Sequence, residues 1–162
     1  MKKFTSIVIF ALLFFVAATA QSSKYIGYRH KGAVLGETLS NGVKSVSGGL
    51  TSNKKFGVSR YTKGGKYMLW LEEVVSRDRD GIPTWIVRNV LTFDDLKKNQ
   101  EFHFSYNSTC TQNEKQNLDL IVKTEFLPRT NSYKILEAWT VNTKTLKFEK
   151  ISIRGVRCEY VP

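Results

Sequence analysis

Short runs that alternate apolar and polar residues are the feature of this sequence that most limits its fold. In "EFHFSY", Phe102, Phe104 and Tyr106 fall on one side of an extended chain, and the residues between them fall on the other. Other largely apolar runs, bounded by turn residues, cover Tyr67–Val75, Thr84–Phe93, Leu118–Val122, Tyr133–Val141 and Leu146–Val156. Regular short strands of this kind predict an all-β fold, a small antiparallel barrel or sandwich.

The last two runs leave details open. Leu146 and Phe148 share one strand register. Ile151 and Ile153 share the other, so a β-bulge near Glu149–Lys150 would restore one inward face. The segment "KILEAW" could instead form one short helical turn, because its isoleucine and tryptophan are spaced i to i+4.

The first 20 residues are typical of a cleaved signal peptide. Met1-Lys2-Lys3 is a short positive head, an apolar run begins at Ile7, and Ala18-Thr19-Ala20 fits the small-x-small cleavage pattern. The apolar run is shorter than the ~20 residues that a membrane-spanning helix needs. We therefore expect export, cleavage after Ala20 and a secreted or periplasmic location.

Residues 21–162 are predicted to form one domain with two parts. Residues 21–66 are rich in Gly, Ser and Lys, with nine of the 11 glycines between Gly27 and Gly65, which favours turns and short edge strands. The main strands are expected in residues 67–162. Cleavage removes two of the 25 Lys and Arg residues and leaves a net charge of +9 against the 14 acidic residues.

Cys110 and Cys158 are the two cysteines of the chain. In an exported protein two cysteines most simply form one disulfide. The alternative is a catalytic thiol, which requires a positioned base. His30 and His103 are the available histidines, and neither stands in a cysteine-protease motif. Both histidines are expected at the solvent-exposed surface, so neither is expected to act as the base of a catalytic thiol. The disulfide is therefore predicted.

The stretch "SRDRDG" at residues 76–81 could be a calcium loop or the tip of a hairpin. With Gly81 at the glycine position of an EF-hand, Val87 occupies the position that requires a bidentate glutamate. Pro83 and the β-rich run behind it also exclude the exiting helix. Asp80-Gly81 fits a turn between two strands, so a hairpin and no metal site are predicted.

Few residues of this sequence are candidates for catalysis or for binding of a cofactor. Gly64-Gly65-Lys66 leads directly into a strand, which favours a turn over a phosphate-binding loop. Glu72 and Glu73 are adjacent on a predicted strand and point to opposite faces, so they cannot act together. Glu137 beside Trp139 could line a sugar-binding groove, and Glu137 is the one candidate catalytic residue. No nucleophile motif or dinucleotide fingerprint is present, and no cofactor is expected.

Positive charge suggests a different kind of partner. Lys144, Lys147 and Lys150 could form a basic stripe beside Trp139 along the final hairpin. Such a stripe could contact an anionic envelope polymer, or another protein. No nucleic-acid-binding motif accompanies it. Asn107 begins an Asn-Ser-Thr glycosylation pattern.

Four segments resemble a group of small exported bacterial proteins found chiefly in cyanobacteria, to which no function is assigned. They are "GVKSVSGGL", "FGVS…GGKYMLWLEE", "RDGIPTWIVRNVL" and "AWTVNTKTLKFEKISIRGVRCE", and the resemblance spans about residues 43–159. It implies export and one domain with a tryptophan-rich hairpin. It implies no catalytic residues.

The sequence thus predicts an exported, non-enzymatic binding or structural domain that contacts an anionic envelope component or a protein partner. Trp139 and the three lysines beside it are its predicted binding residues. The alternative is a small secreted hydrolase that acts on carbohydrate through Glu137. A third hypothesis is an inhibitor of a secreted enzyme, with the loop Ser76–Pro83 as its contact.

Overall fold

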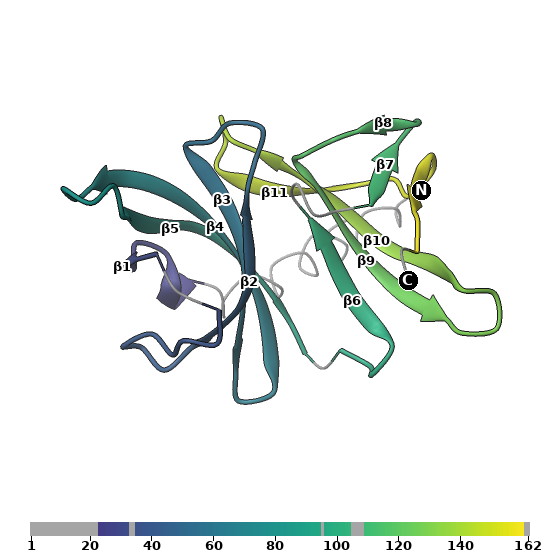
Figure 1. Cartoon of the computed structure of the whole chain (residues 1–162), viewed down its shortest axis with the longest axis horizontal. Helices are drawn as coiled ribbons and strands as arrows, with labels where there is room; N and C mark the ends of the chain where they lie inside the picture. Colours follow the sequence, from purple (N-terminus) through teal and green to yellow (C-terminus); the bar gives the residue numbers. More distant parts are fainter. Residues whose placement is uncertain (1–22, 33–34, 95, 105–108, 161–162) are drawn as a thin grey trace, which may run out of the picture.

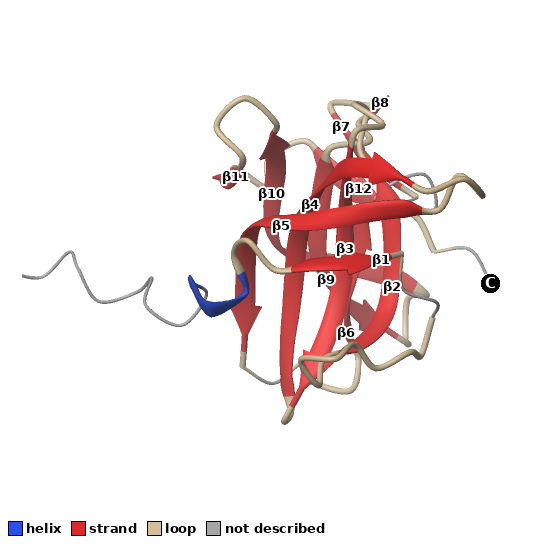
Figure 2. Cartoon of the chain, turned by 90° about the vertical axis from the view of Figure 1, so that its left-hand side faces the viewer, coloured by secondary structure: helices blue, strands red, loops and turns tan. Residues whose placement is uncertain are grey.

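The computed structural model describes residues 23–32, 35–94, 96–104 and 109–160. Within these ranges the chain is all-β, as predicted, apart from one short 3-10 helix (Figures 1 and 2). The elements in order are η1 Ser23–Tyr25, β1 Arg29–Lys31, β2 Lys44–Leu50, β3 Phe56–Lys63, β4 Lys66–Arg77, β5 Pro83–Phe93, β6 Gln100–Phe104, β7 Cys110–Gln112, β8 Lys115–Gln116, β9 Leu120–Leu127, β10 Ser132–Asn142, β11 Lys147–Ile151 and β12 Val156–Cys158. The predicted signal peptide and Asn107 lie outside the described residues. None of the described segments is a helix with the length and apolar character to cross a membrane.

The first sheet has the order β1-β5-β4-β3-β2, is antiparallel, and curls into a half-barrel (Figure 2). Its two long central strands, β4 and β5, shift register between Leu71 and Glu72 and again between Val74 and Ser76. Bulges of this kind bend a strand and increase its twist. They therefore help this sheet to curl and bring β1 close to β4.

Two predicted turns are confirmed. Gly64 and Gly65 join β3 to β4 with φ values of 56° and 78°, the positive values that a two-residue hairpin turn requires. Residues 78–82 join β4 to β5. There the Asp78 carboxylate accepts hydrogen bonds from the backbone N–H groups of Asp80 (3.1 Å) and Ile82 (2.9 Å). The acidic stretch is thus the tip of a hairpin.

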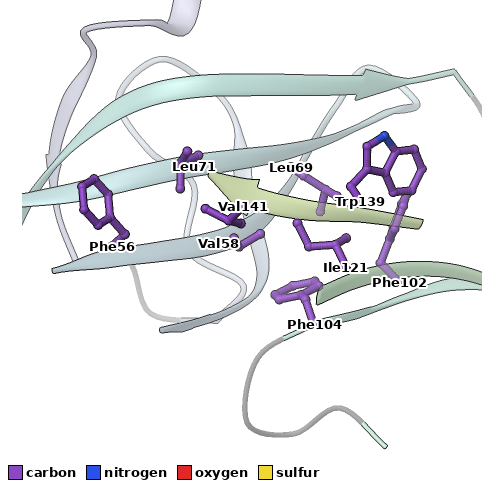
Figure 3. Packing of buried hydrophobic residues seen from close by; sticks show 9 residues of the cluster. All are labelled: Phe56, Val58, Leu69, Leu71, Phe102, Phe104, Ile121, Trp139 and Val141. Carbon is purple, nitrogen blue, oxygen red and sulfur yellow. The ribbon is translucent and has the colours of Figure 1, made fainter. Parts of the chain in front are cut away.

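The second sheet, of order β11-β10-β9-β6, packs against one face of the first. Phe102 and Phe104 are buried and their neighbour His103 is less so, as the alternation predicts. Figure 3 shows the shared core, to which β3 and β4 contribute from one side and β6, β9 and β10 from the other. Its buried members are Phe56, Val58, Leu69, Leu71, Phe102, Phe104, Ile121, Trp139 and Val141.

The third sheet, of order β12-β7-β8, is small and contains the predicted disulfide. Cys110 on β7 and Cys158 on β12 are directly opposite each other in the ladder. Cys110 also packs with buried residues of β9, β10 and β12, namely Leu120, Val122, Ala138 and Val156. The disulfide therefore joins β12 to β7 within the third sheet, and Cys110 packs this sheet on the second.

Two expectations for the final hairpin are wrong. The segment "KILEAW" lies within β10 and is extended, not helical. The bulge expected near Glu149–Lys150 is absent, because β10 pairs with β11 without a shift from Ala138 to Asn142. A register shift occurs instead between Ile135 and Glu137, where β10 pairs with β9. The apolar phase slips within β11, because Phe148 packs on the core shared by the first two sheets and Ile151 packs on the cluster around Cys110.

Candidate binding pocket

A pocket of about 290 Å³ lies against the curled first sheet and receives residues from all five of its strands. His30 comes from β1, Gly48 from β2, Ser59 from β3, Glu72 from β4 and Trp85 from β5. The curl of the sheet is what makes this possible, since strands at its two edges contribute to one hollow. Polar groups and an indole ring therefore meet in one place.

Glycines keep the pocket open. A Cβ atom on Gly57 would lie 3.3 Å from the ring of Trp85, and one on Gly48 would lie 2.8 Å from the Ser59 hydroxyl oxygen. Gly48 pairs with Ser59 across the β2–β3 ladder, so both positions face the same hollow. The glycine-rich composition of residues 21–66 thus has a structural use, because it lets the Trp85 ring and the Ser59 hydroxyl approach the sheet backbone.

The Glu72 carboxylate is buried at the bottom of the pocket and accepts three hydrogen bonds. Its Oε1 atom accepts from His30 Nε2 (2.7 Å) and from the Tyr61 hydroxyl (3.1 Å), and its Oε2 atom accepts from the Ser59 hydroxyl (2.6 Å). A buried charge is tolerated only when it is paired and hydrogen-bonded in this way. Tyr61 also packs on the buried ring of Trp70, with centroids 4.2 Å apart, which anchors the group to the apolar interior.

The hydrogen bonds of His30 favour its protonated, positively charged form. Its Nδ1 atom lies 2.7 Å from the backbone oxygen of Lys31, which can only accept, so Nδ1 carries a hydrogen. Its Nε2 atom faces the Glu72 carboxylate, which already accepts from two hydroxyl groups. Burial lowers the pKa of His30, but the hydrogen bond and charge of Glu72 and the bond to Lys31 outweigh it and raise the pKa above its ordinary value. We conclude that His30 and Glu72 form a buried ion pair.

This ion pair predicts how stability depends on pH. Because the pKa of His30 is raised on folding, its contribution is complete below about pH 6.5, the usual pKa of an exposed histidine, and is lost as pH rises through the pKa of the folded state. The charged groups that act on His30 are Glu72 and Glu37. The backbone oxygen of Lys31 also acts on it, and the rings of Tyr28, Tyr61 and Trp70 pack against it. Denaturant unfolding between pH 6 and 9 should show a falling free energy of unfolding.

The matched control for this decline is His30→Gln, in which the decline should be much smaller. The pKa of His103 is lowered, chiefly by burial, so its contribution has the opposite sign and is lost as pH falls below about 6.5. The two histidines therefore act in separate pH ranges. An NMR titration that gave His30 a pKa below that of an exposed histidine would contradict the ion pair.

The group does not have the order of a catalytic triad. In a triad the histidine lies between the serine and the acid, so that it can remove the hydroxyl proton. Here Glu72 lies in the middle, with Ser59 on one oxygen and His30 on the other. Nor do the described residues contain a group of three or more His, Cys, Asp or Glu side chains that could hold a metal ion. The arrangement can hold a polar ligand. The base that faces the Ser59 hydroxyl is the Glu72 carboxylate itself, which also accepts hydrogen bonds from His30 and Tyr61.

The structure places the predicted site residues elsewhere, on the β10–β11 hairpin of the second sheet. The side chain of Trp139 is in the core and only 6% of the residue is exposed. Glu137 has Lys150 Nζ 2.6 Å from Oε2 and Lys123 Nζ 3.8 Å from Oε1, so lysines face both of its oxygens. Lys150 also lies over the Trp139 ring, with Nζ 5.9 Å from its centroid.

The other two predicted binding residues, Lys144 and Lys147, are exposed. Lys144 lies in the turn between β10 and β11, and Lys147 is the first residue of β11. Glu149 is exposed beside them and accepts a hydrogen bond from Asn142 (2.7 Å). The lysine stripe is therefore interrupted by Glu137 and Glu149. The geometry gathers these lysines on one hairpin, whereas the side chain of Trp139 is buried in the core.

Sequence reasoning missed the pocket. The expectation that His30 is solvent-exposed is wrong, because only 9% of the residue is exposed and its ring contacts Glu72. One signal was present: Glu72 interrupts an almost continuous apolar run, "YMLWLEEVV". A glutamate in a buried strand needs a partner, and one of the two histidines of the chain was available.

No protein-family model, curated protein or solved structure shows significant similarity to this chain. The geometry of the pocket is thus the basis for any functional statement.

Proposed function

We propose that this protein is an exported, non-enzymatic binding domain whose pocket above Glu72 holds a small, uncharged, hydroxyl-rich ligand such as a sugar unit. One observation carries the proposal: a buried His30–Glu72 ion pair at the bottom of a pocket that is also lined by hydroxyl groups and by Trp85. Pockets of this kind combine a hydrophobic or aromatic surface with a few well-placed polar groups.

Charge favours a neutral ligand. His30 and Glu72 are the ionisable acid and base that line the pocket, and they neutralise each other. Among the residues that the structure describes, the lining includes no lysine or arginine to attract a phosphate or carboxylate. An anionic ligand would find no unpaired positive charge in the described lining of the pocket. A cationic ligand would face the Glu72 carboxylate, which already accepts three hydrogen bonds from the protein.

The lining favours hydroxyl groups. Ser45 and Ser47 bring side-chain hydroxyls that can both donate and accept, and Ser59, whose hydrogen is donated to Glu72, can accept. Trp85 supplies a large apolar surface with rigid geometry. A sugar ring presents C–H groups on its faces and hydroxyls around its edge, which matches an indole beside a row of serines.

Export is supported by two features of the chain. The first 20 residues fit a cleaved signal peptide, and a disulfide of this type is typical of oxidising compartments. We propose that the domain acts outside the cytoplasm, where neutral glycans are available.

Calorimetric titration with a panel of neutral mono- and disaccharides tests the proposal. We expect one saccharide to bind, and Trp85→Ala to weaken its binding by about tenfold or more, equivalent to at least about 1.4 kcal/mol. The bound sugar should be recovered unchanged, because the Glu72 carboxylate beside Ser59 is already engaged by two other donors, His30 and Tyr61. As a control, Lys144→Glu with Lys147→Glu should leave saccharide binding as it is.

The outcome that would overturn the proposal is binding of an anionic glycan alone. Such binding would be lost on reversal of the two lysine charges and unaffected by Trp85→Ala. Such a result would indicate that the ligand binds to the lysines of the β10–β11 hairpin and not in the pocket above Glu72.

A further inference from the structure

A second pocket, also of about 290 Å³, lies at the end of the second sheet where β6 and β10 begin and β9 ends. It is lined by Glu101 on β6, Phe126 on β9, Tyr133 on β10 and Tyr160, which follows β12, together with residues 98–100. Figure 1 shows β6, β9 and β10 side by side there, with the C-terminal segment passing close to them. The site shares no residue with the pocket above Glu72.

Three aromatic rings form one side of this second pocket. The ring centroids of Phe126 and Tyr160 are 5.0 Å apart, those of Phe126 and Tyr133 are 5.7 Å apart, and those of Tyr133 and Tyr160 are 6.1 Å apart. The ring planes meet at 33° to 60°. The rings therefore form a continuous, angled aromatic surface, of which Tyr160 is 40% exposed.

Negative charge lies beside these rings, although the whole chain has a formal net charge of +11. The side chain of Glu101 is 45% exposed. Burial and a hydrogen bond to this carboxylate raise the pKa of Tyr133 to about 12, so the Tyr133 hydroxyl stays neutral and holds Glu101 at the pocket. Glu125 lies on the neighbouring strand and accepts a hydrogen bond from Asn99 (3.1 Å).

Three basic groups lie near Glu101. Arg60 on β3 interacts with the Glu101 charge from outside the pocket lining, and burial lowers the pKa of this arginine. His103 Nε2 is 3.6 Å from Glu101 Oε1, but burial lowers the pKa of His103 and favours its neutral form. Lys98 is the basic residue of the lining and is exposed. An aromatic surface next to a carboxylate attracts an organic cation through the negative faces of the rings, and quaternary ammonium groups are bound in this way.

We propose that the pocket formed by Glu101, Phe126, Tyr133 and Tyr160 binds a quaternary ammonium group. The rings contact its methyl groups, and the Glu101 carboxylate neutralises its charge. The group can belong to a free cation such as choline or to a lipid headgroup that has the same chemistry. This site is independent of the function proposed above, because the two pockets lie on different sheets.

Choline and 3,3-dimethylbutan-1-ol, which has the same shape without the charge, form a matched pair of probes. We expect the ring-proton NMR signals of Tyr133 and Tyr160 to shift with choline, and with the neutral alcohol at least roughly fivefold more weakly. Tyr160→Ala should weaken choline binding by a similar factor, whereas Tyr160→Phe should retain it. Glu101→Gln should also weaken it.

Loss of folding is separable from loss of binding in this test, because Tyr160 is 40% exposed and lies outside the described strands. Tyr160→Ala should keep the wild-type melting temperature and its saccharide binding. Sedimentation with phosphatidylcholine vesicles identifies a lipid headgroup as the source, and binding of free choline without vesicle binding identifies a soluble cation. Equal binding of the neutral alcohol, unchanged choline affinity in Tyr160→Ala, or no response to choline would overturn the proposal.

Discussion

Glu72→Ala is expected to lower the free energy of unfolding by about 3–5 kcal/mol. The side chains of His30 and Glu72 are 5% and 3% exposed, so removal of the carboxylate leaves a buried imidazolium without its partner. The hydroxyl groups of Ser59 and Tyr61 lose their acceptor at the same time. Denaturant unfolding at pH 6, where the ion pair is fully formed, measures this loss.

Glu137→Gln is the matched control. Glu137 also pairs with a lysine at 2.6 Å, but the lysine side chain is 65% exposed, and such surface pairs contribute only about 0–1 kcal/mol. A combined His30→Ala and Glu72→Ala variant should lose less than the sum of the two single losses, because each single change leaves a charge unpaired. Equal losses for Glu72→Ala and Glu137→Gln would contradict the buried ion pair.

Removal of the disulfide has the second large effect. Cys110 and Cys158 are 48 residues apart in sequence, and a cross-link that closes a loop of this size contributes about 4 kcal/mol in the chain-entropy model. Replacement of both cysteines by alanine should lower the free energy of unfolding by about this amount. Hydrogen exchange should rise first in β12, because its ladder to β7 is only three residue pairs long.

Reducing agent provides the control for this second variant. Added to the wild-type protein, it should lower stability to near the level of the double alanine variant, and it should leave that variant unchanged. If the reduced and oxidised proteins unfold at the same denaturant concentration, the disulfide does not hold the third sheet in the way described.

Local features of the sequence predicted much of the fold. The alternation around Phe102 and Phe104 identified a strand and its inward face, because side chains in a strand alternate with a period of two. Gly64-Gly65 and Asp80-Gly81 identified two turns, because few residues adopt the positive φ values that tight turns need. These are short-range effects, and they are visible in a few consecutive residues.

The pocket could not be predicted in the same way. His30 and Glu72 are 42 residues apart, and they meet because β1 pairs with β5 and not with β2, which follows it in sequence. This strand order depends on long-range packing and on the curl of the sheet. Trp139 illustrates the same limit, since strand alternation alone does not reveal that its face is covered by the first sheet.

The central claim is that the pocket above Glu72 binds a neutral polyhydroxylated ligand. A ¹H–¹⁵N NMR titration of the isotope-labelled protein with the panel of neutral saccharides tests it most directly. We expect the backbone signals of Gly48 and Gly57 and the indole N–H signal of Trp85 to move together, while those of Lys144 and Lys147 stay in place. Signals that moved only on the β10–β11 hairpin, or no movement with any saccharide of the panel, would contradict the claim.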